Sequence, residues 1–232
     1  MTTQLVAPPT TSRSLTLNPL RWSRGTGAVV SGIALALMAP LAVFGVFIAI
    51  NGLITVGDAE KTAQSIAGSP ALWIAGVVTM FVVVLLDFVA AAGMIALFRD
   101  VRRGLSIVAG VARIAYGVVF AVAIAQLAVA YTSLDDPRST LASIEAFQAI
   151  WMLSLGLFGI CLLMIAYLAI RSGFVPKVFG ILVGIAGLGY IADTAGVTFV
   201  DGFAPIFGNF GFVGEVAIIV WLLIKGRKLS RI

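Results

Sequence analysis

Six long apolar stretches follow one another along the chain, separated by short segments that carry charges, glycine or proline. An α-helix needs about 20 mostly apolar residues to cross a hydrocarbon core of about 30 Å. We therefore expect six transmembrane helices, over residues 28–51, 71–98, 105–131, 146–170, 178–195 and 207–224. The last two stretches are short for a span, so we expect local thinning of the bilayer or flanking side chains that reach toward the headgroups.

The composition agrees with a chain that lies in lipid. It is 61% hydrophobic and 11% charged, whereas soluble domains contain about 25% charged and about 45–50% apolar residues. Such a chain cannot cover itself with polar surface in water. We predict an all-α, polytopic membrane protein with six transmembrane helices in one bundle, surrounded by the lipid bilayer.

The polar segments divide the chain into three parts. Residues 1–27 are rich in Thr, Ser and Pro, so we expect a disordered or interfacial basic tail. Its apolar neighbour begins too late and lasts too long for a cleavable signal peptide. Residues 28–225 form the six-helix transmembrane domain, and residues 226–232 form a short basic tail. Between the first two spans, the stretch AEKTAQSI can form one or two helical turns on the surface.

The basic residues predict the orientation. With six spans, twelve of the 15 Lys and Arg residues fall on one side of the membrane, together with both termini. The other side holds Lys61, Arg138 and most of the acidic residues. Cytoplasmic loops carry an excess of Lys and Arg. We therefore expect both termini in the cytoplasm, which also explains the net charge of +5 without nucleic acid as a partner.

Four ionisable residues lie inside the predicted spans, namely Asp87, Arg113, Asp193 and Glu215. Each costs a few kcal/mol at the bilayer centre unless it faces protein or water. At a rise of 1.5 Å per residue, the first, second and fourth lie about 17, 14 and 15 Å from the cytoplasmic ends of their helices, near mid-membrane. Asp193 lies about 24 Å from that side, so we expect an interfacial acid near the outer headgroups.

The second and third spans are joined by a tight loop, so they must be neighbours. We predict an ion pair between Asp87 and Arg113 inside the bundle, with Glu215 facing it and holding a proton as the less well paired acid. Small residues lie on the helix faces of these charges and permit close packing. The candidate packing glycines are Gly110, Gly208 and Gly211, and a separate G-xxx-G pair in the fifth span, Gly180 and Gly184.

Enzymatic chemistry has little support in this sequence. There is no histidine, and the lone cysteine, Cys161, lies within a predicted span. No phosphate-binding loop or metal-ligand motif is present, so we expect no cofactor and no metal. An enzyme would have to rely on Asp87, Glu215 and Tyr116. Tyr190, one turn before Asp193, is a further secondary candidate.

Three stretches resemble a known family. They are LLDFVAAAGMIALF (85–98), RSGFVPKVFGILVGIAGLGYIAD (171–193) and GEVAIIVWLLIKG (214–226). Together they are similar to the bacterial integral-membrane family catalogued as "domain of unknown function 4386", from the first span to Gly226. The resemblance implies a multi-pass protein of the bacterial cytoplasmic membrane and no known activity. It also places Asp87 and Glu215 at positions that resemble the family's own polar intramembrane sites.

Two functions stay open. The cluster of Asp87, Arg113 and Glu215 predicts either a structural polar clamp in a regulatory or scaffolding membrane module, or the central site of a proton- or cation-linked transporter of a small molecule. A scaffold would act through a membrane-protein partner or a second copy of the chain. Matching positions of Asp87 and Asp193, and of Arg113 and Glu215, also suggest that the two three-helix halves form an inverted repeat.

Overall fold

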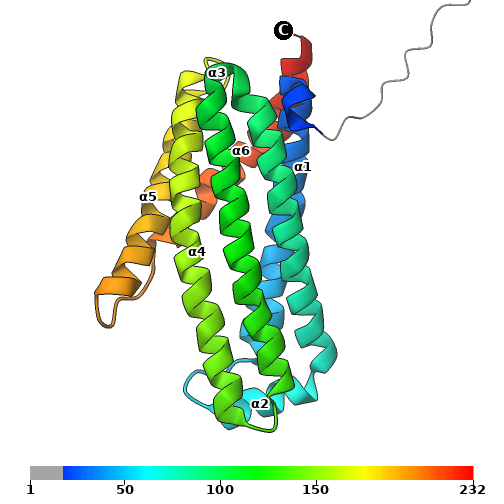
Figure 1. Cartoon of the computed structure of the whole chain (residues 1–232), viewed down its shortest axis with the longest axis vertical. Coiled ribbons are helices and arrows are strands. Elements are labelled where there is room, and N and C mark those ends of the chain that lie inside the picture. The colour runs from blue at the N-terminus through cyan, green and yellow to red at the C-terminus, as the bar shows by residue number, and fades with distance from the viewer. Residues whose placement is uncertain (1–17, 232) are drawn as a thin grey trace, which may run out of the picture.

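The computed structural model describes residues 18–231, and all of their side chains except those of 208–214, 227, 230 and 231. Every long element in this part of the chain is a helix (Figure 1). The helices are α1 (Arg24–Ala42), α2 (Ala59–Gly68), α3 (Pro70–Thr132), α4 (Pro137–Arg171), α5 (Lys177–Phe199) and α6 (Phe207–Lys225). Short helical segments flank them: η1 (Pro19–Arg21), η2 (Val43–Ile50), η3 (Asn51–Leu53) and η4 (Gly226–Arg231).

α3 is two helical segments joined with almost no loop. Its 63 residues are interrupted at Arg102, where φ is −159° and ψ is 94°. This single extended residue turns the chain, so that the first limb (70–101) and the second limb (103–132) run side by side (Figure 1). The expected spans 71–98 and 105–131 each lie within one limb. Helices two and three are therefore neighbours, as the short basic loop predicted.

The helices are long and apolar enough to cross a membrane. Four continuous helical stretches of the described residues meet this condition: Arg24–Leu53, Pro70–Thr132, Pro137–Arg171 and Lys177–Phe199. Each long helix also exposes large apolar side chains on its outer face. Examples are Leu37, Leu85, Val111, Leu153, Ile185 and Ile224. The chain is thus an all-helical, polytopic membrane bundle in contact with lipid, and the exact number of spans stays a prediction.

Two helices are longer than their apolar cores, which corrects the predicted bounds. α4 begins nine residues before 146, because the Asp136 carboxylate caps it by accepting hydrogen bonds from the Ser139 hydroxyl and the Arg138 and Ser139 amides. These bonds lower the pKa of Asp136 below its ordinary value. α5 continues four residues past 195 to Phe199. Hydropathy does not detect such polar or interfacial turns.

The first helix also departs from the prediction. It starts at Arg24, capped by the Ser23 hydroxyl, which accepts from the Thr26 amide. The last residues of the expected disordered tail are therefore helical, while residues 1–17 lie outside the described part. Pro40 lies inside α1 and has no amide hydrogen to donate. The wider π-helix η2 begins three residues later and carries the chain to the end of the span.

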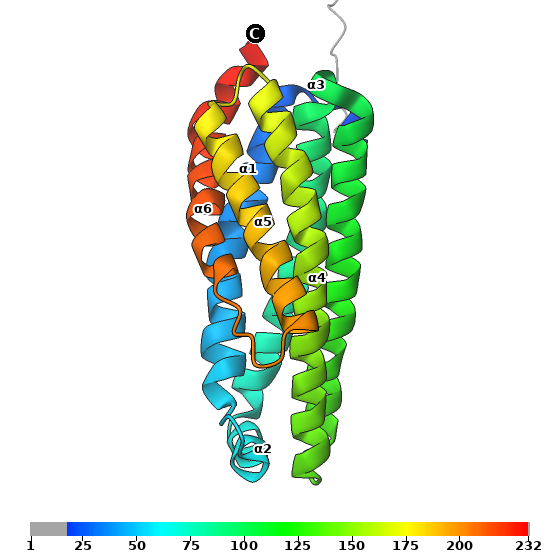
Figure 2. The ribbon, with the colours of Figure 1, turned by 90° about the vertical axis from the view of Figure 1, so that its left-hand side faces the viewer.

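The helices pack in a closed ring, and they extend to different distances along the bundle. α1 packs on α3, α3 on α4, α4 on α5, and α5 on α6, which returns to α1. The start of α1 and the end of α6 lie at the same end of the bundle, and α2 lies at the other (Figure 1). The stretch AEKTAQSI, for which we expected one or two helical turns on the surface, lies in the ten-residue helix α2. The α5–α6 connection ends well short of this α2 end, to which α3 and α4 extend (Figure 2).

Glycine pairs set the closest helix contacts. A Cβ on Gly27 of α1 would lie 2.6 Å from the Gly93 carbonyl oxygen of α3, and one on Gly159 of α4 would lie 2.6 Å from the Gly187 carbonyl oxygen of α5. Any side chain at these positions would push the backbones apart. Small residues allow such approach between membrane helices, where packing replaces the hydrophobic effect.

Candidate functional site

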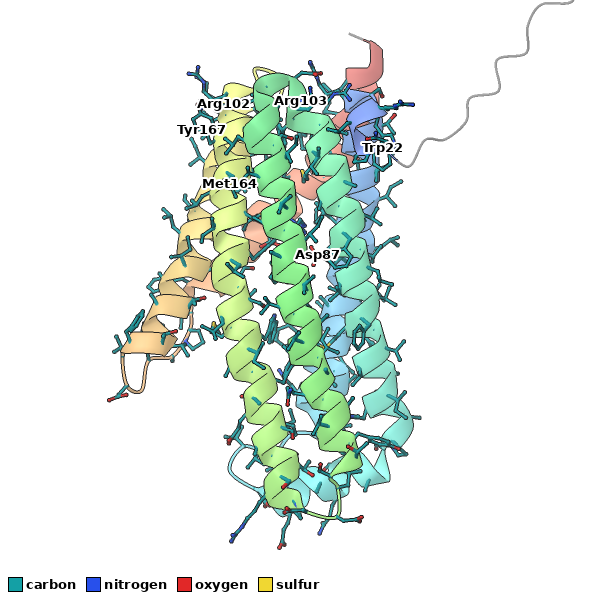
Figure 3. All side chains as sticks on the ribbon, viewed as in Figure 1. Trp22, Asp87, Arg102, Arg103, Met164 and Tyr167 are labelled. Atoms are coloured by element: carbon teal, nitrogen blue, oxygen red, sulfur yellow. The ribbon has the colours of Figure 1, made fainter. Side chains whose placement is uncertain are left out.

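Asp87 and Arg113 meet across the turn of α3. Asp87 lies on the first limb, about midway along the bundle (Figure 3), and Arg113 lies on the second limb. The Nη2 atom of Arg113 is 2.5 Å from Oδ1 of Asp87, and only 4% and 1% of the two side chains are exposed. The reversal at Arg102 produces this meeting, because it returns the chain past its own first limb.

The pair is buried and incompletely hydrogen-bonded. Neither Oδ2 of Asp87 nor Nε of Arg113 has a hydrogen-bond partner among the described residues. Buried polar atoms without partners cost about 1–3 kcal/mol each, and more when they are charged. Each charge of the pair therefore depends on the other, since both side chains are almost fully buried.

Phe158 of α4 is the apolar centre of the site. The guanidinium carbon of Arg113 lies 5.1 Å from the centre of its ring, which is within the range of a cation–π interaction. The ring of Tyr116 lies 4.8 Å away and that of Tyr190 5.5 Å away, both in tilted arrangements. Phe158 is 6% exposed. It thus connects the second limb of α3 to α5.

Glu215 belongs to a second polar pair. The Tyr190 hydroxyl of α5 donates to Oε1 of Glu215 on α6, at 2.9 Å. Among the described residues, no ion pair joins Glu215 to Arg113. The two nevertheless line one cavity of about 20 Å³, which is about the space that one water molecule needs. The remaining wall is apolar and includes Leu35 of α1, Met94 of α3 and Ile219 of α6.

Asp193 corrects the sequence interpretation. We expected an interfacial acid, but the residue is buried, with 4% exposed. Its Oδ1 accepts hydrogen bonds from the amides of Ile206 and Phe207, at 3.0 and 3.1 Å. These are amides at the start of α6, which have no partners within the helix. Asp193 therefore anchors α6 to α5. The short α5–α6 connection places the start of α6 beside Asp193.

The candidate packing glycines have different surroundings. A Cβ on Gly180 would lie 3.1 Å from the Ala166 carbonyl oxygen, whereas one on Gly184 would make an ordinary contact of 3.4 Å with the Ala166 Cβ. Gly110 faces the side chain of Ile95 across the turn of α3. The surroundings of Gly208 and Gly211 lie outside the described part of the structure.

The chemistry that this arrangement allows is narrow. In the part of the chain that is described, no three His, Cys, Asp or Glu side chains gather as a metal site. The Cys161 thiol is buried and donates to the Ala109 carbonyl oxygen. The site can fix helices through charge and hydrogen bonds, or hold and release a proton at Glu215. Its functional role stays a prediction.

Comparison with known proteins now adds the family. The family model "Domain of unknown function (DUF4386)" matches residues 30–226. The chain belongs to this family. An uncharacterized protein of Archaeoglobus fulgidus is 33% identical over 156 residues, which cover 67% of this chain and 86% of that protein. No solved structure matches the chain. The resemblance seen in the three sequence stretches is confirmed, and DUF4386 brings no activity with it.

Sequence reasoning missed Phe158, although its ring contacts Arg113, Tyr116 and Tyr190. A phenylalanine within an apolar run carries no signal in a single sequence, because the same residue fits a lipid-facing position equally well. The bond between Tyr190 and Glu215 was also missed. Both residues were candidates, but nothing in the sequence says which faces of the fifth and sixth helices meet.

Replacing Phe158 tests whether its ring supports Arg113. Phe158→Leu removes the cation–π contact and two aromatic contacts, so it should cost about 1–2 kcal/mol more of the free energy of unfolding than an ordinary Phe→Leu change. Phe147→Leu is the matched control, because Phe147 is also buried on α4 and, among the described residues, its ring stacks only on that of Trp151. Denaturation of the purified protein in mixed micelles measures both. Equal losses would show that Arg113 gains nothing from the ring.

Proposed function

We propose that this DUF4386 protein is a regulatory or scaffolding membrane module, and that the ion pair of Asp87 and Arg113 is a structural polar clamp at its centre. The observation that carries the proposal is the near-complete burial of a 2.5 Å ion pair that bridges the two limbs of α3. A charge in the bilayer core is costly alone and tolerable when paired. The pair therefore selects the one register of the limbs in which both charges meet.

The contacts around the clamp extend this fixing to the later helices. Phe158 brings α4 against Arg113, and Tyr190 of α5 holds Glu215 of α6. Asp193 binds the start of α6. A buried centre whose polar side chains are bonded to one another suits a rigid module that works through its surfaces. Its partner is a membrane protein or a second copy of the chain.

We further propose that the protein lies in the bacterial cytoplasmic membrane with both termini inside. The bundle end that holds the start of α1 and the end of α6 also carries Arg24, Arg99, Arg103, Lys225 and Lys228. Basic residues beside membrane helices are strongly biased to the cytoplasmic side.

A second candidate function is a proton- or cation-linked transporter. The observation in its favour is the cavity that Arg113 and Glu215 share at the middle of the bundle. An ionisable residue beside such a space is a common feature of proton pathways. The volume of about 20 Å³ is large enough for one water molecule, which could pass on a proton, and too small for a metabolite. A transporter would have to open this cavity during its cycle.

A double-mutant cycle tests the clamp. Asp87→Asn or Arg113→Gln alone leaves one buried charge without its partner and should cost about 3–5 kcal/mol of the free energy of unfolding. The double variant contains no buried charge, so it should be clearly more stable than either single variant. Denaturation in mixed micelles gives the four values.

The control pair for this cycle is Asp135→Asn and Arg138→Gln, which removes exposed charges at the α2 end. Each of these should change stability by no more than about 0.5 kcal/mol. The clamp is rejected if the double variant is as unstable as the sum of its two singles, because the charges would then act independently.

Labelling with a hydrophobic carbodiimide separates the clamp from the transporter. The reagent modifies protonated carboxyl groups that it can reach from lipid. If the site is a closed clamp, neither Asp87 nor Glu215 reacts at any pH between 5 and 9. If Glu215 works in a transporter, it reacts, and proteoliposomes show a proton flux that Glu215→Gln abolishes. Peptide mapping by mass spectrometry identifies the modified residue, and this second result would replace our first proposal.

Two single-cysteine variants test the orientation. Gly104 and Gly68 are exposed at opposite ends of the bundle, and neither has an atom within 4 Å of an added Cβ. In a Cys161→Ala background, Gly68→Cys should react with a membrane-impermeant maleimide in intact spheroplasts, and Gly104→Cys should react only after lysis. The opposite pattern would mean that both termini lie outside.

A further inference from the structure

We propose that the bundle end carrying the termini contains a binding site for the phosphate group of an anionic phospholipid. The site is a pocket of about 310 Å³ lined by Leu20, Arg99, Asp100 and Arg103. It lies where the short segment η1 packs against the turn of α3. Nothing in the clamp takes part in it, so the two proposals stand or fall separately.

On the wall of this phosphate pocket, Arg99 and Asp100 are held by contacts within the protein. The Nη1 atom of Arg99 donates to the Leu20 carbonyl oxygen. The Nε atom of Arg99 donates to Oδ1 of Asp100 at 3.4 Å. Oδ2 of Asp100 accepts from Arg24 at 3.2 Å. The Arg24 guanidinium lies 5.1 Å from the centre of the Phe174 ring. Fixed side chains lose little entropy on binding, which favours affinity.

The charge of the pocket is unbalanced. The carboxylate of Asp100 faces two guanidinium groups, those of Arg24 and Arg99, and Arg103 adds a third. Arg103 is exposed and forms no ion pair with a described residue. Guanidinium groups bind phosphate oxygens through two parallel hydrogen bonds. A monoanionic phosphate diester would offset this surplus of positive charge and give Arg103 a partner.

The location favours a lipid over a soluble phosphate. Trp22 and Arg103 both lie toward the end of the bundle where α1 starts and α3 turns (Figure 3). Trp and basic side chains are typical of the headgroup level of a membrane. Basic pockets beside the ends of transmembrane helices bind anionic headgroups. A lipid held there keeps its acyl chains along the exposed apolar faces of α1 and α3, which a soluble phosphate cannot use.

The test uses the full-length protein purified in a neutral detergent. Phosphatidylglycerol is titrated in, and native mass spectrometry gives the dissociation constant of the first bound lipid. Arg103→Gln should weaken this binding about ten-fold or more, because it removes a charge-assisted hydrogen bond to phosphate. Phosphatidylcholine, whose headgroup has no net charge, should bind the wild-type protein much more weakly.

Arg102→Gln is the matched control. It removes the same charge at the same end of the bundle, but Arg102 is outside the pocket and donates to the Tyr167 hydroxyl (Figure 3). If both variants weaken binding equally, the attraction is a general surface charge and the pocket proposal is wrong. It is also wrong if glycerol 3-phosphate binds as tightly as phosphatidylglycerol, since the ligand would then be a soluble phosphate. Discrimination between the variants and between the ligands supports the pocket.

Discussion

The interaction on which the rest of the structure depends is the ion pair between Asp87 and Arg113. Each charge alone is costly in the middle of a membrane, and pairing removes most of that cost only when the geometry is close. The two residues lie on opposite limbs of α3, so this condition fixes how the limbs align. The single extended residue at Arg102 leaves no loop that could absorb a different register.

The later helices meet the ion pair, or one another, through further contacts near it. α4 meets Arg113 through Phe158, so a charge is held partly by an apolar residue on a third segment. α6 is attached to α5 by two carboxylates, Asp193 at its first amides and Glu215 through Tyr190. Polar contacts of this kind are directional, whereas apolar packing in lipid tolerates sliding. The polar groups therefore specify positions, and the glycine contacts of α1 with α3 and of α4 with α5 specify distances.

The fold and the candidate site could be predicted only where a feature has a recognisable pattern in a single sequence. Apolar length revealed the helices, and shared depth with a tight loop revealed the meeting of Asp87 and Arg113. The burial of Asp193 was missed because the sequence gives only its position along one helix, while its partners are the amides at the start of the next one. The extra turns of α4 were missed because a cap such as Asp136 lies outside the apolar run. Phe158 is informative only once its neighbours are known.

The contact between α1 and α6, which closes the ring of helices, lacks, in the described part of the chain, the polar side-chain bonds found elsewhere in the bundle. α1 and α6 meet through small residues, since a Cβ on Gly226 would lie 2.7 Å from the Ala28 Cβ, and one on Gly32 would lie 3.1 Å from the Leu222 Cβ. Among the described residues, no side-chain hydrogen bond or ion pair joins these two helices. The cavity beside Glu215 is walled on this side by Leu35 of α1 and Ile219 of α6. A transporter would have to open this wall during its cycle, whereas a structural clamp would keep it closed.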